Sequence, residues 1–177
     1  MTKILTLLAM LALSGVAHAG QFSLHVDAAD AHGHVRPQFV YNAGGCHGQD
    51  VSPKVAWSDP PKGTQGFALT VYDPDAKGGW WHWMAVDIPP ITRAIQQDGT
   101  LPPGAYALTN SFGHARWDGP CPPGTDAPHH YVFTLYALDT PALGADDSTT
   151  PEAAKALIQK HAIGKASVTF TYGRQSR

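Results

Sequence analysis

Two short stretches of the chain combine acidic, imidazole and phenol side chains with stiff loops of proline and glycine. The first runs from Asp73-Pro74-Asp75 to His82, and the second runs from Gly119-Pro120 to His129 and Tyr131. Each stretch places an imidazole at the start of an alternating, strand-like run. If the two loops meet at one end of a sheet, these side chains and nearby backbone N–H groups would line a small cavity. Such a set of groups suits a small anion.

The first stretch supplies a carboxylate in a fixed position. Asp73 follows a strand pattern and precedes Pro74, which ends the strand and restricts Asp73 to extended geometry. The Asp73 carboxylate can accept a hydrogen bond from the His82 ring, or it can form an Asx-type turn, which the Asp-Pro pair favours by itself. His82 lies among tryptophans, so two interpretations of it remain, an imidazole that faces the cavity and a histidine buried in the core. The same two interpretations apply to His129.

The second stretch supplies a phenol and a rigid wall. Tyr131 shares a strand face with His129, because alternate residues of a strand point the same way, and its hydroxyl can donate to a bound oxyanion. His130 is predicted to point to the opposite face. Gly119 lets a ligand approach the backbone closely, and Pro120 stiffens the loop before binding. An ordinary rigid turn is the alternative interpretation of this loop.

No pattern in the sequence predicts catalysis. A Gly-x-Ser-x-Gly elbow, a Walker-type phosphate loop and a recognisable catalytic triad are all missing from the chain. We therefore expect a binding protein rather than an enzyme, with no cofactor. The two histidines together with Asp73 meet the count for a two-His, one-carboxylate metal site, which leaves a metal-dependent enzyme as an alternative.

Residues 1–19 are predicted to be a signal peptide. Lys3 gives a positive start, residues 4–13 form an apolar run too short to cross a bilayer as a helix, and Ala17-His18-Ala19 is a cleavage signal. We expect an exported protein, periplasmic or secreted, with a single domain over residues 20–177. An uncleaved anchor is the alternative, and no later segment predicts a membrane span.

Charge and cysteine content restrict the partners and the compartment. The chain has 12 Lys and Arg against 14 Asp and Glu, whereas a nucleic-acid-binding domain needs a clustered basic face, so we expect no nucleic acid partner. The two cysteines, Cys46 and Cys121, both lie in loops containing glycine or proline. An oxidising compartment favours a disulfide between them. Two free thiols are the alternative, because pairing needs Cα atoms within about 7 Å.

The secondary structure predicted around these residues consists mainly of strands. The 15 prolines and 18 glycines divide the chain into short pieces, which is typical of a sheet protein with many turns. Alternating patterns predict strands at residues 22–26, 66–72, 82–88, 131–138 and 168–172. One helix is predicted from Thr150-Pro151 to a stop at Gly164. We expect a mainly β fold, an antiparallel Greek-key-like β-sandwich with a C-terminal α-helix packed on it.

The motifs, in this order, resemble the two signature regions of the phosphatidylethanolamine-binding protein family, in its bacterial Raf-kinase-inhibitor-like branch. The resemblance is carried by Asp73-Pro74-Asp75-Ala76, His82-Trp83, Gly119-Pro120-x-Pro122-Pro123 and His129-x-Tyr131-x-Phe133, and it extends from about residue 22 to residue 172. It implies a pocket for phosphate or a phosphorylated head group. The residues that would form this pocket are Asp73, His82, Gly119, Pro120, His129 and Tyr131.

The sequence departs from the family pattern at two positions. Lys77 stands where the family usually has a proline, and His130 stands where an arginine usually separates the histidine from the tyrosine. The family is also associated with inhibition of kinases and of proteases. Export would remove a cytosolic kinase from reach, so a protease inhibitor or another protein-binding role is the alternative function that the resemblance implies.

Overall fold

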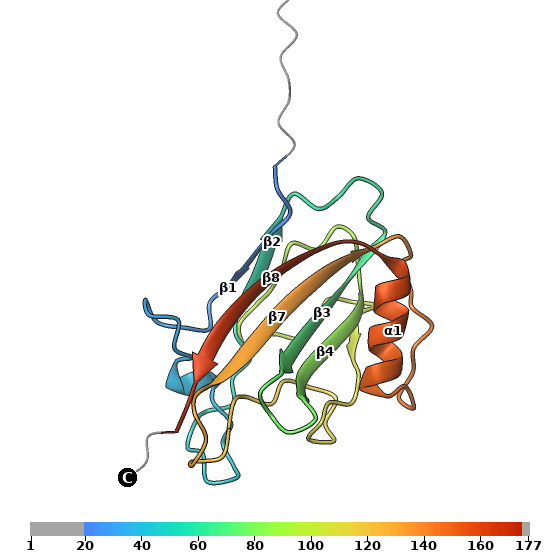
Figure 1. The fold of residues 1–177 in the computed structure, drawn as a ribbon. Coiled ribbons are helices and arrows are strands. Elements are labelled where there is room, and N and C mark those ends of the chain that lie inside the picture. Colours follow the sequence, from blue (N-terminus) through green and yellow to red (C-terminus); the bar gives the residue numbers. More distant parts are fainter. Residues whose placement is uncertain (1–19, 175–177) are drawn as a thin grey trace, which may run out of the picture.

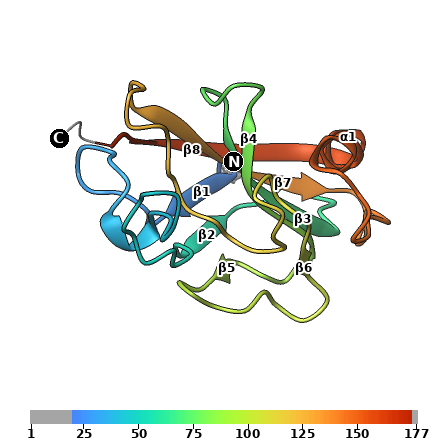
Figure 2. The same ribbon diagram turned by 90° about the horizontal axis from the view of Figure 1, so that it is seen from below.

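The computed structural model describes residues 20–174, and the predicted signal peptide lies outside the described residues. Two β-sheets and one α-helix make up the described chain (Figures 1 and 2). The elements are β1 (Ser23–Val26), the short 3-10 helix η1 (Pro37–Phe39), β2 (Val55–Ser58), β3 (Gly66–Asp73), β4 (Trp80–Ile88), β5 (Ala94–Ile95), β6 (Tyr106–Ala107), β7 (His129–Leu138), α1 (Pro151–His161) and β8 (Ala162–Tyr172). Over residues 20–174, no helix has the length and apolar character that a bilayer crossing requires.

Both sheets are antiparallel. The smaller sheet has the strand order β1-β2-β5, and the larger has the order β6-β4-β3-β7-β8. Every pairing within them is antiparallel. The prediction of a mainly β, antiparallel fold with one C-terminal helix is confirmed. Strand β3 is central, with β4 on one side and β7 on the other.

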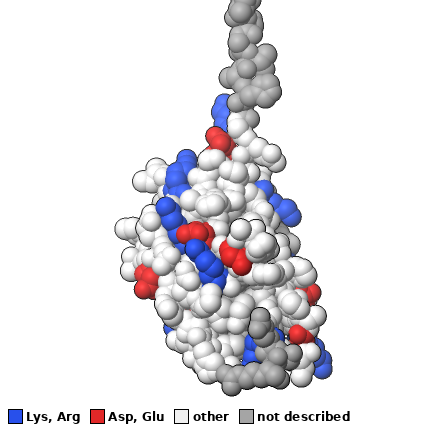
Figure 3. All heavy atoms as spheres, turned by 90° about the vertical axis from the view of Figure 1, so that its left-hand side faces the viewer, with Lys and Arg blue, Asp and Glu red and all other residues white. Residues whose placement is uncertain are grey.

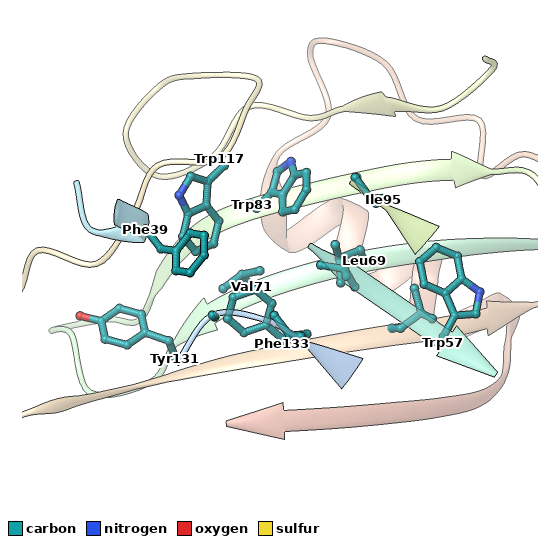
Figure 4. Close-up of a cluster of buried hydrophobic side chains, with 14 of the residues drawn as sticks. Phe39, Trp57, Leu69, Val71, Trp83, Ile95, Trp117, Tyr131 and Phe133 are labelled. Atoms are coloured by element: carbon teal, nitrogen blue, oxygen red, sulfur yellow. The ribbon is translucent and has the colours of Figure 1, made fainter. Parts of the chain in front are cut away.

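The principal core lies between the two sheets. On β3, Phe67, Leu69 and Val71 alternate on the face that packs toward the smaller sheet. Figure 4 shows Leu69 and Val71 in the same cluster as Phe133 from β7 and Trp57 from β2. Aromatic and β-branched side chains fill such a pleated surface well, and this explains why the alternating patterns of the sequence become buried strands.

The opposite face of the larger sheet packs against the helix. Ala154 and Ile158 of α1 are buried in a second cluster with residues of β3 and β4. Thr150 caps the helix, since its hydroxyl accepts a hydrogen bond from the backbone N–H of Ala153 at 3.2 Å. The predicted stop at Gly164 is wrong, because the helix ends at His161 and β8 follows without an intervening turn.

The antiparallel arrangement brings together the C-terminal end of β3 and the N-terminal ends of β4 and β7, at one end of the strands of the larger sheet. Strand β3 ends where β4 and β7 begin, at the lower end of the sheet in Figure 1. A disulfide between Cys46 and Cys121, with Cα atoms 5.9 Å apart, joins two long loops near this edge. The predicted pairing of the two cysteines is therefore confirmed in the structure.

Charges are mixed on the surface shown in Figure 3. Basic and acidic side chains are interspersed across the described part of that face, without a broad area of one sign. This face does not provide the clustered positive charge that nucleic acid binding requires.

Candidate ligand-binding site

A cavity of about 360 Å³ opens at the edge where β3 ends and β4 and β7 begin. Its wall combines charged, imidazole and phenol groups with an apolar rim. The lining residues are Asp73, Ala76, Lys77, Trp80, His82, Phe112, Cys121, Pro122, Pro123, Asp126, His129 and Tyr131. Four of the predicted site residues, Asp73, His82, His129 and Tyr131, are thus brought together around one cavity.

Asp73 holds both its own loop and a neighbouring histidine. Its Oδ1 accepts hydrogen bonds from the backbone N–H groups of Asp75 and Ala76, at 2.9 and 3.1 Å. Its Oδ2 lies 2.7 Å from Nδ1 of His129. The Asx-type turn and the carboxylate–imidazole pair therefore coexist. The predicted pairing of Asp73 with His82 is wrong, because the histidine of β7 takes that position.

His82 is anchored by a backbone carbonyl instead. Its Nδ1–H donates to the carbonyl oxygen of Asp118 at 2.7 Å, which leaves Nε2 without a proton in the neutral ring. Burial lowers the pKa of His82 and outweighs the opposing effects of Asp118 and Asp73, so the neutral form is favoured. Nε2 is buried and has no hydrogen-bond partner within residues 20–174. The ring therefore presents an unused acceptor.

Tyr131 presents an unused donor beside it. The Tyr131 and His82 rings make an edge-to-face contact with centroids 5.1 Å apart. The phenol oxygen is buried and lacks a hydrogen-bond partner in the described chain. Burial raises the pKa of the Tyr131 phenol, so the group keeps its proton and remains a donor.

His129 lies between two carboxylates. Its Nδ1 faces Asp73, and its Nε2 lies 3.5 Å from Oδ2 of Asp126. Its side chain is only 6% exposed, whereas that of Asp126 is 45% exposed on the loop that precedes β7. Asp126 was not predicted as a site residue, and no binding role was predicted for Lys77. The position of Asp126 three residues before His129 is the one signal that could have found it.

His130 and Asp75 form a separate pair outside the cavity. The backbone N–H and Nδ1 of His130 lie 2.7 and 2.8 Å from Oδ2 of Asp75. The backbone N–H of His130 is the main cause of the lowered pKa of Asp75. His130 is exposed, which agrees with its predicted position on the face opposite to His129.

Gly119 and Pro120 do not belong to the described lining of the cavity, where Cys121, Pro122 and Pro123 form that wall. The N–H of Gly119 donates to Oδ1 of Asp50 at 2.7 Å, so it is already used and is not free to bind a ligand. A Cβ at position 119 would collide with the backbone carbonyl of Phe39. Glycine is needed there for close packing of two chain segments, and its expected role of admitting a ligand is replaced by this structural one.

The rim of the cavity is aromatic. Trp80 is 37% exposed, and its ring meets Phe112 edge to face with centroids 5.4 Å apart. Phe112 also contacts Tyr41, at a centroid distance of 4.8 Å. A ligand whose polar end enters the cavity would therefore leave its remaining atoms against an apolar surface.

The two histidines and Asp73 do not form a metal-ligand set. Within residues 20–174, no three His, Cys, Asp or Glu side chains converge closely enough to hold a metal ion. The atoms that could bind a metal are already hydrogen-bonded within the protein. Nδ1 of each histidine bonds to a protein oxygen, and both carboxylate oxygens of Asp73 accept hydrogen bonds. The arrangement suits hydrogen bonding to a small ligand better than metal coordination.

Comparisons with known proteins agree with this architecture. The family model described as phosphatidylethanolamine-binding protein matches residues 27–173. Protein YbcL of Escherichia coli strain K12 is 37% identical over 175 residues, covering 94% of each chain. LppC of Mycobacterium tuberculosis H37Rv, which is named as a lipoprotein, is 39% identical over 128 residues, covering 72% of this chain and 62% of its own.

The fold is also shared with a solved structure. The crystal structure of E. coli YbcL, titled as a new member of the mammalian PEBP family, has a TM-score of 0.84 and 35% sequence identity to this chain. The superposition covers 88% of this chain and 100% of that one. The two chains therefore share the arrangement of strands that places the cavity.

Proposed function

Because this chain belongs to the phosphatidylethanolamine-binding protein family, we propose that it is an exported binding protein for a small phosphate-type anion or a phosphorylated head group. The ligand enters the cavity formed by Asp73, His82, His129 and Tyr131. No catalytic turnover accompanies binding. The export part of this proposal is supported by the leader-like residues 1–19 and by the lipoprotein name of the relative LppC.

One observation carries the proposal. The described chain leaves two buried polar atoms in the cavity lining without partners, Nε2 of His82 and the hydroxyl of Tyr131. Each such atom costs about 1–3 kcal/mol when it stays unsatisfied, so native proteins carry few of them. One atom is an acceptor and the other is a donor. A protonated phosphate satisfies both, since its P–OH donates to His82 and another of its oxygens accepts from Tyr131.

The lining carries charges of both signs, which suits a ligand that has both an anionic and a cationic group. Lys77 supplies positive charge at the cavity, and the carboxylates of Asp73 and Asp126 supply negative charge. Asp126 lies on the more exposed side of His129, where it would pair with a cationic group of a head group. The aromatic rim at Trp80 and Phe112 would contact the apolar remainder of the ligand.

Tyr131→Phe is expected to separate binding from stability. The change removes only the unpartnered hydroxyl, so we expect about a tenfold loss of affinity for phosphate, equivalent to roughly 1.4 kcal/mol. The free energy of unfolding should stay the same or rise by about 1 kcal/mol, because a buried unsatisfied group is removed. Calorimetric titration with inorganic phosphate and phosphoethanolamine, together with urea unfolding, measures both quantities.

Tyr136→Phe is the matched control for that experiment. Tyr136 lies on the same strand as Tyr131 but outside the described lining of the cavity. Its replacement should leave the affinity unchanged. Equal phosphate affinities for wild type and Tyr131→Phe would refute the proposed site.

Binding is expected to take up a proton. Neutral His82 requires a donor, and a phosphomonoester has a second pKa of about 6, so its protonated form becomes abundant as pH falls. The affinity for phosphoethanolamine should rise by roughly fiftyfold between pH 8 and pH 6, as the protonated fraction increases from about 1% to about 50%. Calorimetry in buffers of different ionisation enthalpy measures the proton uptake directly. His130→Gln, which changes a histidine outside the cavity, should keep the same pH profile, and an affinity that does not change with pH in wild type would contradict the assignment of His82.

A further inference from the structure

A second cavity, of about 240 Å³, is lined in part by residues 115–117, just before Gly119 in the chain. Its wall is built from loop residues and from two core tryptophans, and it includes Asp50, Ser52, Trp83, Asp98, Arg116 and Trp117. Among the described residues, the two cavities have no lining residue in common. The second cavity is therefore a separate place in the fold.

Two buried polar atoms of this second lining have no partner. Oδ1 of Asp50 accepts from the N–H of Gly119 at 2.7 Å, but Oδ2 has no hydrogen bond to any residue of the described chain. The indole Nε1 of Trp117 is likewise unpartnered within residues 20–174. The Asp50 side chain is 2% exposed and Trp117 is 4% exposed, although both residues line the cavity. One is an acceptor and the other is a donor.

The charge of this lining is negative. Arg116 is the one Lys or Arg among the described residues that line it. Its Nη2 lies 2.9 Å from Oδ1 of the fully buried Asp118 and 3.7 Å from Oδ2 of Asp50, beyond hydrogen-bond distance. Asp118 is also bonded to His114 and to the Asn110 amide. Among the residues that line the cavity, two carboxylates, of Asp50 and Asp98, face the single guanidinium of Arg116. Burial is the main cause of the raised pKa of Asp50, and the Asp118 carboxylate adds to it. The N–H of Gly119, together with Arg116 and His114, acts in the opposite direction.

We propose that this second cavity binds a small primary ammonium compound that also carries a hydroxyl oxygen. The ammonium group donates to Oδ2 of Asp50, and the hydroxyl accepts from Nε1 of Trp117. Both unpartnered atoms are satisfied by one molecule, and the cationic charge offsets the acidic lining. The proposal does not depend on the function of the first cavity.

The chemistry of the wall favours an organic cation over a metal ion. The described residues hold no group of three His, Cys, Asp or Glu side chains that could coordinate a metal. The wall instead contains Trp83 and Trp117, whose rings meet edge to face at a centroid distance of 6.1 Å. Figure 4 shows both indoles in the aromatic cluster above strands β3 and β4. Indole rings suit the methylene groups of an alkylammonium ion and attract its charge.

Three probe molecules of the same length separate the contributions of the ammonium group and of the hydroxyl group to binding. The probes are 3-aminopropan-1-ol, which has both groups, butylammonium, which replaces the hydroxyl with a methyl group, and butan-1-ol, which replaces the ammonium with a methyl group. Titration of the isotope-labelled protein, followed by NMR, should give the highest affinity for 3-aminopropan-1-ol and at least tenfold lower affinity for butan-1-ol. The indole N–H signal of Trp117, assigned by its loss in Trp117→Phe, should shift only with the hydroxyl-bearing amine.

Asp50→Asn is the decisive variant. Asp50 has φ of 58°, a left-handed conformation that asparagine adopts readily. The amide oxygen of asparagine can still accept from Gly119, while its NH₂ group replaces the acceptor Oδ2. We expect at least a tenfold loss of affinity for 3-aminopropan-1-ol in Asp50→Asn, and about the same affinity as wild type in the control Asp139→Asn, which changes an exposed aspartate elsewhere. Tyr131→Phe, in the first cavity, should bind the amine normally.

Several outcomes would overturn the proposal. Equal binding of butan-1-ol and 3-aminopropan-1-ol would exclude recognition of the cation, and undiminished binding by a folded Asp50→Asn would exclude Asp50 as the acceptor. If Asp50→Asn does not fold, the titrations of the wild-type protein with the three probes still test the proposal. A Trp117 indole signal that stays unmoved at saturating amine means that the cavity holds water only.

Discussion

Removing the disulfide by replacing Cys46 and Cys121 with serine is expected to lower the free energy of unfolding by about 4 kcal/mol. The bond closes a loop with a sequence separation of 75 residues, and the chain-entropy model gives this amount for a loop of that length. For a chain of this size, the melting temperature should fall by roughly 10 °C. Thermal unfolding of wild type and the double variant under identical conditions measures the effect.

The same change should also weaken the ligand-binding site. Cys121 lines the cavity, and its partner Cys46 is buried in the principal core, so the bond fixes the wall to the body of the protein. Preorganised walls bind more tightly because less ordering is required on binding. We expect phosphate affinity to fall when wild type is reduced as well as in the double variant. An unchanged melting temperature after complete reduction, verified by thiol titration, would show that the bond contributes nothing to stability.

Replacing Asp73 with alanine is expected to destabilise the fold by about 3–5 kcal/mol, because it breaks a buried hydrogen-bond network around a carboxylate. The carboxylate is 4% exposed and accepts from His129 and from two backbone N–H groups of its own loop. Its loss leaves a buried imidazole without its partner and releases the turn after β3. Urea unfolding measures the stability, and phosphate titration at a temperature where the variant is folded should show no detectable binding.

Asp75→Ala is the control for the Asp73 variant. Asp75 also pairs with a histidine, His130, but the two side chains are 41% and 55% exposed. Exposed pairs of this kind contribute about 0–1 kcal/mol. The change should therefore leave stability and phosphate affinity nearly unaltered. Equal losses in the two variants would mean that burial of the Asp73–His129 pair has no special importance.

Sequence patterns alone predicted five of the eight strands of the described chain, the start of the helix and the family. The short strands β2, β5 and β6 were not predicted. Alternating runs such as residues 66–72 and 131–138 became central strands because both of their faces are covered by apolar layers. Thr150-Pro151 became a helix start because the cap depends on local backbone geometry. The helix stop at Gly164 failed because pairing of β8 with β7 replaced the expected turn.

The pairing of the site residues follows from the packing of the strands and could not be predicted from the sequence. Strand β3 lies between β4 and β7, so the carboxylate at its end has a histidine-bearing strand on each side, and Asp73 pairs with His129 rather than with His82. Spacing along the chain does not distinguish these two neighbours, because hydrogen-bond choice depends on strand register and side-chain orientation. The role of Gly119 and the unpartnered atoms of His82, Tyr131, Asp50 and Trp117 were hidden for the same reason. Burial and hydrogen-bond satisfaction are properties of packed segments that lie far apart in the sequence, so they arise only when the fold brings those segments into contact.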